Sequence, residues 1–321
     1  MKAIRYDEYG DADQLYVQSG PAPAPAEDEA LVRIKAFSIN ELDWKLRNGD
    51  LKIASGIPHE TGIGSDLAGV IEQVRPNTFQ FQPGDAVIGW LPMSDQGAYA
   101  THAVVKLKHL IRKPESMSFE EASCLPMVGA TAWQAMREEA RLQPGQRVLI
   151  NGCTGAVGHY AVQIAKHLGA HVTGTCSTAH VEDALTLGCD EVIDYRQADI
   201  RESGKTFDVI LDTSKQLPFS EAKPLMAAPS VYLDPQPGLG ALMGSFLNNI
   251  FSEKKRDVLS VEVRQEDLQY LTEMVERGLL QTRVGRVYDW VAAIEAVRTH
   301  EAGTAHVVGK LVVRVTDADL K

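Results

Sequence analysis

The stretch from Arg147 to Leu168, RVLINGCTGAVGHYAVQIAKHL, has the order of a buried strand, a glycine turn and a helix. Its first residues form a short apolar run, which is typical of a strand in a parallel sheet. Gly152, Gly155 and Gly158 follow at intervals of three, and apolar residues then recur at helical spacing. Because the first N–H groups of a helix have no partner within it and lie at the positive end of its dipole, this turn predicts a phosphate site.

The next strand indicates which dinucleotide would bind. The range His171–Cys176 reads as a second strand that ends about 20 residues past the turn, as in a dinucleotide-binding unit. An NAD site usually has Asp or Glu at this strand end to hold the ribose 2′-hydroxyl. This chain has Ser177 and Thr178 instead, and no acidic residue occurs there before Glu182. Ser177 can donate a hydrogen bond to a 2′-phosphate, so we expect NADP(H).

The positive charge that a 2′-phosphate needs has two candidate sources. One is His180, which could equally be an exposed residue at the start of a helix. The other is Arg196, beside Tyr195 at the end of a further short strand. The expected phosphate-binding set therefore contains Ser177 and either His180 or Arg196, together with the glycine turn.

Length and composition favour a two-domain globular protein. The chain has 321 residues, 44% hydrophobic and 23% charged. No apolar run is long enough for a membrane span, and the N-terminus lacks the apolar core of a signal peptide, so we expect a cytoplasmic protein. Four cysteines without CxxC spacing indicate reduced, buried thiols, and the net charge of −11 argues against nucleic acid and anionic membranes.

The order of the expected elements differs between the two parts of the chain. The first hundred or so residues alternate short strands with Gly/Pro turns, which favours a barrel-like β domain. A capping box at Ser118–Glu121 opens a helical region that Pro126 interrupts and that resumes over Thr131–Arg141. Strands and helices then alternate from Arg147, which predicts a doubly wound parallel sheet. Near the end we expect helices at Glu266–Gly278 and Asp289–His300.

Several motifs, in order along almost the whole chain, carry a family resemblance. They are AFSINELDWKLRNGD, GSDLAGVIEQV, FQPGDAVIGW, GAYATHAVV, LPMVGATAWQAM, NGCTGAVGHYAVQIAK, GCDEVIDYR and HVVGKLVVRV. In this set the chain resembles the medium-chain dehydrogenase/reductase superfamily, and within it the zinc-free quinone oxidoreductase (zeta-crystallin-like) branch. The resemblance implies a GroES-like, mainly β substrate domain over residues 1–122 and 265–321. It places an α/β Rossmann domain over residues 123–264.

Zinc alcohol dehydrogenases of this superfamily bind their catalytic metal through Cys and a Gly-His-Glu motif. By alignment of the motifs, the Cys position is Asn40 here, and the His-Glu pair is Ser65-Asp66. Asn and Ser are poor zinc ligands. The loop between Trp90 and Gly97 is also too short for the four-cysteine zinc lobe. We therefore expect no metal.

The resemblance implies a zinc-independent oxidoreductase that transfers a hydride from NADPH to a quinone or an α,β-unsaturated carbonyl compound. Such an electrophile needs alignment with the nicotinamide and exclusion of water more than a strong acid or base. A non-catalytic NADPH-binding accessory or sensor protein is the alternative. The resemblance also implies a homodimer.

Candidate site residues follow from the same motifs, each with a structural alternative. Asn40 matches an Asn beside the nicotinamide, or is a helix N-cap. Asp43 has a role in the site, or is structural and paired with a cation. Thr131 lies near the nicotinamide carboxamide, or is an ordinary helix residue. Tyr195 lies against the 2′-phosphate, or is a half-buried residue at a strand end. The expected pyrophosphate turn comprises Gly152, Gly155, Ala156, Val157 and Gly158.

Three stretches depart from the family pattern. Leu51 occupies a position where many members have a tyrosine facing the substrate. Thr213–Pro218 replaces a glycine-rich stretch. Pro235–Phe251 is a pocket wall or lid, or else core or a subunit contact. These departures leave the identity of the substrate open.

Overall fold

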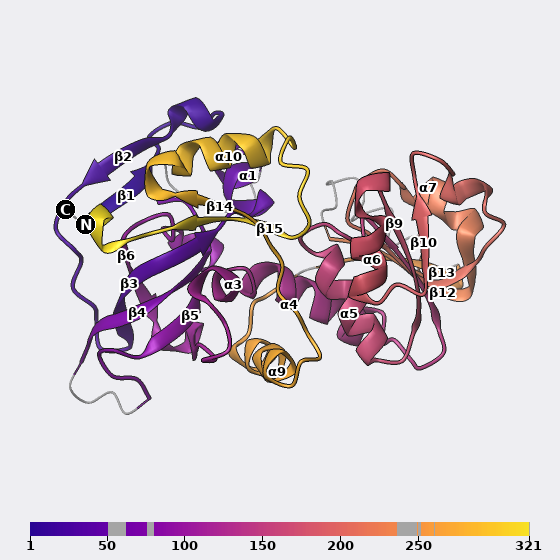
Figure 1. Cartoon of the computed structure of the whole chain (residues 1–321), viewed down its shortest axis with the longest axis horizontal. Coiled ribbons are helices and arrows are strands. Elements are labelled where there is room, and N and C mark those ends of the chain that lie inside the picture. The colour runs from indigo at the N-terminus through magenta and orange to yellow at the C-terminus, as the bar shows by residue number, and fades with distance from the viewer. Residues whose placement is uncertain (51–61, 76–79, 236–248, 250–251, 260, 321) are drawn as a thin grey trace. The chain divides into compact units, whose positions relative to one another are not determined.

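The structure is a computed structural model that describes residues 1–50, 62–75, 80–235, 249, 252–259 and 261–320 (Figure 1). These residues form two compact units. The first unit comprises residues 1–127, 263–276 and 282–321, and the second comprises 128–262 and 277–281. Leu51 and most of the Pro235–Phe251 segment lie outside the described residues.

The second unit contains a parallel sheet of six strands among the described residues, in the order β10-β9-β8-β11-β12-β13. This order confirms the predicted Rossmann-type sheet. Consecutive strands β8 and β9 lie side by side, and β11 pairs with the other edge of β8, so the chain reverses its direction of travel across the sheet at β8. The strands are β8 (Arg147–Asn151), β9 (His171–Cys176), β10 (Glu191–Asp194), β11 (Phe207–Asp212), β12 (Met226–Asp234) and β13 (Lys254–Val258).

Helices connect these strands. They are α5 (Gly158–His167), α6 (Val181–Leu187) and the short α7 (Phe219–Ala222), preceded by α3 (Phe119–Ser123) and α4 (Pro126–Gln134). The predicted interruption of the helical region at Pro126 is confirmed, because α3 ends at Ser123 and α4 begins at Pro126, although the helix resumes there and not at Thr131. A proline is tolerated in the first helical turn, where its missing N–H has no acceptor. The helix beyond Gln134 changes to a π-helix over Ala135–Glu139.

The first unit is built on a mainly antiparallel sheet of seven strands among the described residues, in the order β14-β15-β3-β4-β5-β7, with β6 also paired to β3. This β-rich architecture confirms the predicted GroES-like domain. Phe37 and Tyr99 stack in its core with ring centroids 4.6 Å apart. The strands are β3 (Glu29–Ser38), β4 (Asp66–Val74), β5 (Ala86–Trp90), β6 (His102–Lys106), β7 (Leu110–Arg112), β14 (Val284–Asp289) and β15 (Lys310–Arg314). A hairpin adds β1 (Lys2–Arg5) and β2 (Tyr16–Ser19), and the helices are α1 (Glu41–Asn48), α9 (Gln265–Glu276) and α10 (Ala293–Glu301).

One late element differs from the sequence-based expectation. The helix predicted over Asp289–His300 is shorter, because α10 begins at Ala293 and the edge strand β14 precedes it. The side chains of β14 are half-buried or exposed, so this strand lacks the apolar alternation by which it could be recognised.

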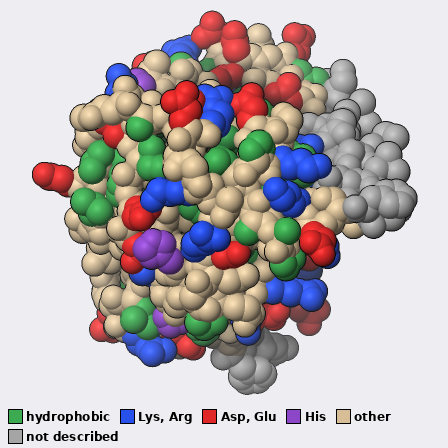
Figure 2. Space-filling model, turned by 90° about the vertical axis from the view of Figure 1, so that its right-hand side faces the viewer, with side chains coloured by type: hydrophobic (Ala, Val, Ile, Leu, Met, Phe, Trp, Pro, Cys, Tyr) green, Lys and Arg blue, Asp and Glu red, His purple; other side chains and the backbone are tan. Residues whose placement is uncertain are grey.

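Charged side chains of both signs are interspersed on the face shown in Figure 2. Among the described residues, no helix has both the length and the apolar character needed to cross a membrane.

Candidate active site

The glycine turn between β8 and α5 requires glycine at its two ends. Gly152 has φ +86°, and a Cβ there would lie 2.7 Å from Thr213 Oγ1. A Cβ on Gly158 would lie 2.1 Å from the carbonyl oxygen of Gly152, closer than any real Cβ contact. The start of α5 is therefore packed directly against the end of β8, which is the close approach that the phosphate turn of this fold needs.

A buried polar network at the ends of the strands supports this turn. The Asn151 side chain donates to Asp212 Oδ1 at 2.9 Å and to Ser214 Oγ at 2.7 Å, and it accepts a hydrogen bond from Thr175 Oγ1. Thr175 Oγ1 in turn accepts from the Gly152 N–H at 3.0 Å. These residues end β8, β9 and β11, so the network fixes the adjacent strand ends that carry the turn.

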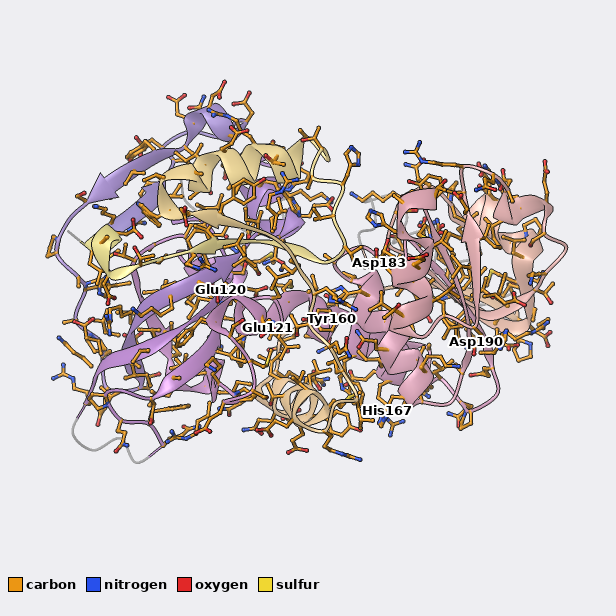
Figure 3. The ribbon with its side chains drawn as sticks, in the orientation of Figure 1. Glu120, Glu121, Tyr160, His167, Asp183 and Asp190 are labelled. Carbon is orange, nitrogen blue, oxygen red and sulfur yellow. The ribbon has the colours of Figure 1, made fainter. Side chains whose placement is uncertain are left out.

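The middle residues of the turn are accessible to a phosphate. Gly155, Ala156 and Val157 are partly exposed, whereas Gly158 and Tyr160 on α5 are buried. Figure 3 labels Tyr160 on this helix. A Cβ on Gly155 would meet only the Gly152 carbonyl oxygen, at 3.3 Å. The first N–H groups of α5 have no acceptor within the helix, and the dipole of the helix favours an anion there. The turn therefore fits the pyrophosphate of a nicotinamide dinucleotide.

The ends of β9 and β10 bring together Ser177 and Tyr195. Asp194 is paired in register with Cys176, and the Tyr195 N–H donates to the Cys176 carbonyl at 3.1 Å. Tyr195 is 59% exposed, so it is not the half-buried strand-end residue of the structural alternative. An exposed ring next to Ser177 is available to a ligand bound at this strand end.

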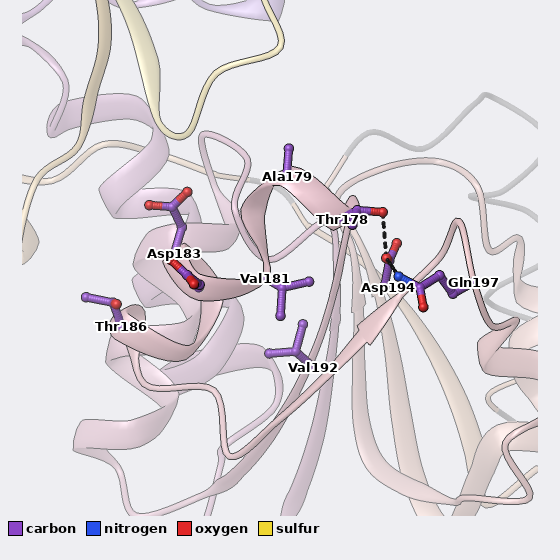
Figure 4. Close-up of a pocket in the computed structure, with 9 residues that line it drawn as sticks. Thr178, Ala179, Val181, Asp183, Thr186, Val192, Asp194 and Gln197 are labelled. Atoms are coloured by element: carbon purple, nitrogen blue, oxygen red, sulfur yellow. Dashed lines mark hydrogen bonds between the residues drawn. The ribbon is translucent and has the colours of Figure 1, made fainter.

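Asp194 is a carboxylate at this strand end that the sequence reasoning missed. It accepts hydrogen bonds from Thr178 Oγ1 at 2.6 Å and from the Gln197 side chain at 2.7 Å (Figure 4). The hydrogen bond from Thr178, with that from the Arg196 N–H, lowers the pKa of Asp194. Asp194 follows Thr178 by 16 residues and lies beyond α6, so only the pairing of β9 with β10 reveals that the two side chains meet.

His180 lies at the N-cap position of α6 and is half-buried. Its Nδ1 is 3.2 Å from Asp183 Oδ2, on α6 (Figure 3). The negative charge of Asp183 would offset a positive charge on His180, so the pair as a whole would attract a phosphate only weakly. Arg196 is exposed and directly follows Tyr195, which leaves it the better placed of the two predicted cations.

A pocket of about 690 Å³ opens beside these strand ends (Figure 4). Its lining includes Thr178, Val181, Asp183, Val192 and Asp194. The pocket begins at Thr178, the residue after Ser177, and Glu182, Asp183 and Asp194 give its lining a negative charge.

In the first unit, Asn40 belongs to a cluster of buried polar side chains. It precedes α1 at the N-cap position and is 4% exposed. Its side-chain oxygen accepts a hydrogen bond from Lys310 Nζ at 2.5 Å, and its side-chain N–H donates to Asp66 Oδ2 at 3.1 Å. Asn40 therefore has the backbone position of a cap, but its amide is committed to Lys310 and Asp66.

Asp66 is completely buried and accepts hydrogen bonds from several groups. Lys310 Nζ lies 3.3 Å from its Oδ2, Ser38 Oγ donates to the same oxygen at 3.4 Å, and the Met127 N–H donates to Oδ1 at 3.2 Å. Both side chains of the ion pair are at most 1% exposed. A buried pair of this kind is stable only when hydrogen bonds satisfy its remaining groups, as they do for Asp66.

Asp43 is held by neutral donors. Its carboxylate accepts hydrogen bonds from Ser65 Oγ and Tyr99 OH, each at 2.7 Å, and from the Asn40 N–H at 3.0 Å. Burial raises the pKa of Asp43, while the hydrogen bonds from Tyr99 and Ser65 oppose that rise. These donors to Asp43 are hydroxyl and N–H groups, whereas a structural role is expected to pair it with a cation. Its contacts tie α1 to the loops before β4 and β6.

The three predicted catalytic residues are divided between the units. Asn40 and Asp43 lie in the first unit, at the start of α1. Thr131 lies in the second unit, in α4, and is 6% exposed. Their roles at the nicotinamide stay predictions.

The residues aligned with zinc ligands do not fit zinc. Asn40 and Ser65 supply no thiolate or imidazole, and Asn40 and Asp66 are hydrogen-bonded to the ammonium group of Lys310. In the part of the chain that the structure describes, no three His, Cys, Asp or Glu side chains are grouped to hold a metal ion.

A half-buried histidine contacts α1. His300 Nδ1 accepts a hydrogen bond from Trp44 Nε1 at 3.1 Å, so the ring is neutral at this nitrogen. Burial, and next the positive charge of Lys310, lower the pKa of His300 to about 4. The contact joins α1 to α10 and depends on the unprotonated ring.

We expect acid to weaken the first unit through His300. Its folded-state pKa of about 4 lies below the usual 6.5, so the unfolded chain binds the proton first as the pH falls. The free energy of unfolding should fall by about 2–3 kcal/mol between pH 7 and pH 4 from this group. His300→Gln keeps an acceptor for Trp44 but cannot be protonated, and urea unfolding at several pH values should show a shallower loss. An equally steep loss in His300→Gln would contradict this assignment.

Comparisons with known proteins bear on the identity of the chain. Residues 26–115 match the alcohol dehydrogenase GroES-like domain, and residues 187–313 match the zinc-binding dehydrogenase domain. A chloroplastic quinone-oxidoreductase QR1 of Triphysaria versicolor is 33% identical over 326 aligned positions, which cover 98% of each chain. The chain belongs to the medium-chain dehydrogenase/reductase superfamily. Within that superfamily its relatives include quinone oxidoreductases, as the resemblance implied.

Other superfamily members extend the comparison. The 2-methylene-furan-3-one reductase of Solanum lycopersicum is 34% identical over 67% of this chain and 58% of its own. The mitochondrial NAD(P)H oxidoreductase RTN4IP1 of Homo sapiens is 34% identical over 66% of this chain and 59% of its own. The solved quinone oxidoreductase of Coxiella burnetii superposes with a TM-score of 0.87 at 27% identity, covering 98% of this chain and 99% of that one. These matches support an oxidoreductase that uses a nicotinamide cofactor.

Proposed function

We propose that the protein transfers a hydride from NADPH to a quinone or an α,β-unsaturated carbonyl compound, without a metal. The observation that carries this proposal is the pair of sites that the fold builds. The second unit has a glycine turn shaped for a pyrophosphate, and the first unit has a buried ammonium group where zinc-dependent members have ligands. Relatives named as quinone oxidoreductases and as an enone-type reductase support the choice of acceptor.

The residues of the chain have separate tasks in this reaction. The glycine turn and the N-terminus of α5 would bind the pyrophosphate, and Ser177, Tyr195 and Arg196 would face the 2′-phosphate. NADPH, when bound, would supply a hydride, which carries two electrons, to the electrophilic carbon of the acceptor. An amide such as that of Asn40 can hold the acceptor's oxygen, and solvent can supply the proton, so that no strong general acid is required.

The carboxylate charge of Asp194 should reduce the affinity for NADPH relative to NADH. A 2′-phosphate beside Ser177 would be repelled by a carboxylate one strand away, and Thr178 and Gln197 hold that carboxylate at the strand end. We expect Asp194→Asn to bind NADPH roughly three- to ten-fold more tightly, because an exposed like-charge repulsion of this range is removed. NADH affinity should stay the same or weaken.

Fluorescence titration of both cofactors measures this effect. Glu202→Gln is a control that removes one carboxylate charge from an exposed position in the same unit. Asp194→Asn changing NADPH and NADH affinity equally would argue that the 2′-phosphate is bound elsewhere. Tighter binding of NADH than NADPH by the unmodified protein would contradict the NADPH assignment itself.

The activity is tested by NADPH oxidation with 1,4-benzoquinone, 9,10-phenanthrenequinone and an alkenal. We expect turnover with at least one acceptor, and the same rate after dialysis against a chelator. A stoichiometric zinc ion whose removal abolishes turnover would contradict the metal-free mechanism. Binding of NADPH without turnover on any of these acceptors would favour the accessory or sensor protein. A cytoplasmic location and a homodimer remain predictions.

A further inference from the structure

Lys310 is a buried cation that neither the glycine turn nor the cofactor contacts explain. It begins β15, is 2% exposed, and its Nζ lies 2.5 Å from Asn40 Oδ1 and 3.3 Å from Asp66 Oδ2. Burying an ammonium group is costly, and the ion pair with Asp66 only partly offsets that cost. A hydrophobic residue at this position of β15 would pack as its neighbours Leu311, Val312 and Val313 do. Packing alone therefore does not explain why a charged residue occupies position 310.

The direction of the hydrogen bonds suggests that reason. Lys310 donates to the oxygen of the Asn40 amide, which fixes this oxygen toward the ammonium group and the nitrogen on the other side of the amide. One N–H of that nitrogen is used by Asp66, and an amide nitrogen carries a second. An amide whose oxygen accepts from an ammonium group is a stronger donor at its nitrogen, because hydrogen bonds in a chain polarise one another.

We propose that Lys310 is a positioning residue that fixes and polarises the Asn40 amide so that its second N–H stabilises negative charge on the acceptor's oxygen. The inference rests on the proposed reduction of a conjugated carbonyl. It also accounts for the poor fit to zinc: in this chain a fixed ammonium group supplies the positive charge, acting through Asn40, at the position where ligand-bearing members hold a metal.

The chemistry balances with the cofactor already proposed. When a hydride adds to the β-carbon of an enone, a carbon–hydrogen bond forms, the carbon–carbon π bond breaks, and the electron pair moves to the carbonyl oxygen. The nicotinamide is oxidised by two electrons and the acceptor is reduced by two. A proton from water then completes the saturated product. The Asn40 N–H donates to the oxygen while it carries the negative charge, which is the step that a preorganised donor accelerates.

Lys310→Met alone would leave Asp66 buried without its counterion, so the main test uses the neutral double variant Lys310→Met/Asp66→Asn. This variant keeps similar volumes and should fold. We expect its kcat to fall about 100-fold or more, as when one donor to an oxyanion is lost, with little change in KM. The Kd for NADPH should be unchanged, because the glycine turn lies in the other unit.

The kinetic isotope effect separates this role from a structural one. With NADPH deuterated at the transferred position, the double variant should show a larger isotope effect than the unmodified protein, because hydride transfer becomes slower relative to other steps. A variant that is only partly folded would lose NADPH-binding stoichiometry and keep the original isotope effect. Lys35→Met is the matched control, since it removes a lysine from an exposed ion pair with Asp317 in the same unit.

A second cycle tests whether Lys310 acts through Asn40. Asn40→Leu should lower kcat by a similar factor, and adding Lys310→Met/Asp66→Asn to it should lower kcat little further, because the same donor is already gone. Additive losses, or a double variant that keeps kcat within threefold, would overturn the proposed role of Lys310. If the unmodified protein turns over no acceptor in the same assay, the result contradicts the proposed function itself. The proposed role of Lys310, which rests on that function, is then also contradicted.

Discussion

Gly158→Ala should abolish measurable NADPH binding, raising Kd by about 100-fold or more. The added Cβ would lie 2.1 Å from the carbonyl oxygen of Gly152 and 2.9 Å from backbone atoms of Cys153, and none of these atoms can move without shifting the turn. Such a shift displaces the N–H groups at the start of α5, where misplacement of about 1 Å is costly for a bound anion. Fluorescence titration with NADPH measures the loss.

Gly20→Ala is the control for this substitution. A Cβ at Gly20 meets no atom within 4 Å, so NADPH binding should not change. Circular dichroism and thermal unfolding of Gly158→Ala would show whether the second unit still folds. NADPH binding within threefold of the unmodified protein, in a folded Gly158→Ala variant, would mean that the cofactor does not use this turn.

Lys310→Met should lower the free energy of unfolding by about 3–5 kcal/mol, the usual cost of leaving one partner of a buried ion pair uncompensated. Asp66→Asn should cost a comparable amount, because Lys310 would then be the buried charge without a counterion. The double variant should recover much of the loss, since both charges are removed together. Urea unfolding of the three variants and the unmodified protein at pH 7 gives the coupling free energy between Lys310 and Asp66 directly.

The surface pair of Lys35 and Asp317 supplies the comparison. The Asp317 side chain is 73% exposed, so Lys35→Met should change the free energy of unfolding by less than about 1 kcal/mol. Equal and additive effects of Lys310→Met and Asp66→Asn would show that the two charges do not interact, contrary to their 3.3 Å separation.

Local patterns predicted the second unit well. The glycine turn, the strand before it and the amphipathic helix after it all read from consecutive residues, because each element buries a regular face. The edge strand β14 was missed, since its half-exposed side chains carry no alternation. Pro126 marked the break between α3 and α4, but the sequence placed the restart of the helix at Thr131, because a proline can end one helix or start the next.

The candidate site was predictable only where it follows the chain. The cofactor turn is contiguous, but Asp194 joins Thr178 through the pairing of β10 with β9. Lys310 meets Asn40 across a separation of 270 residues, which no spacing rule reports. The family motifs indicated Asn40 and Ser65-Asp66 as former metal-ligand positions, and the fold added the lysine that binds there. Leu51 lies outside the described residues, so its part in substrate binding is a prediction.

Transfer of deuterium from NADPH to an acceptor tests the central claim most directly. The unmodified protein is incubated with an alkenal and NADPH deuterated at C4, in each of its two stereochemical forms, after exhaustive treatment with a chelator. The account predicts that one form, and not the other, delivers its deuterium to the β-carbon of the saturated product, with no dependence on added zinc. Product without deuterium from either form, or deuterium transfer only after zinc is restored, would contradict a metal-free hydride transfer.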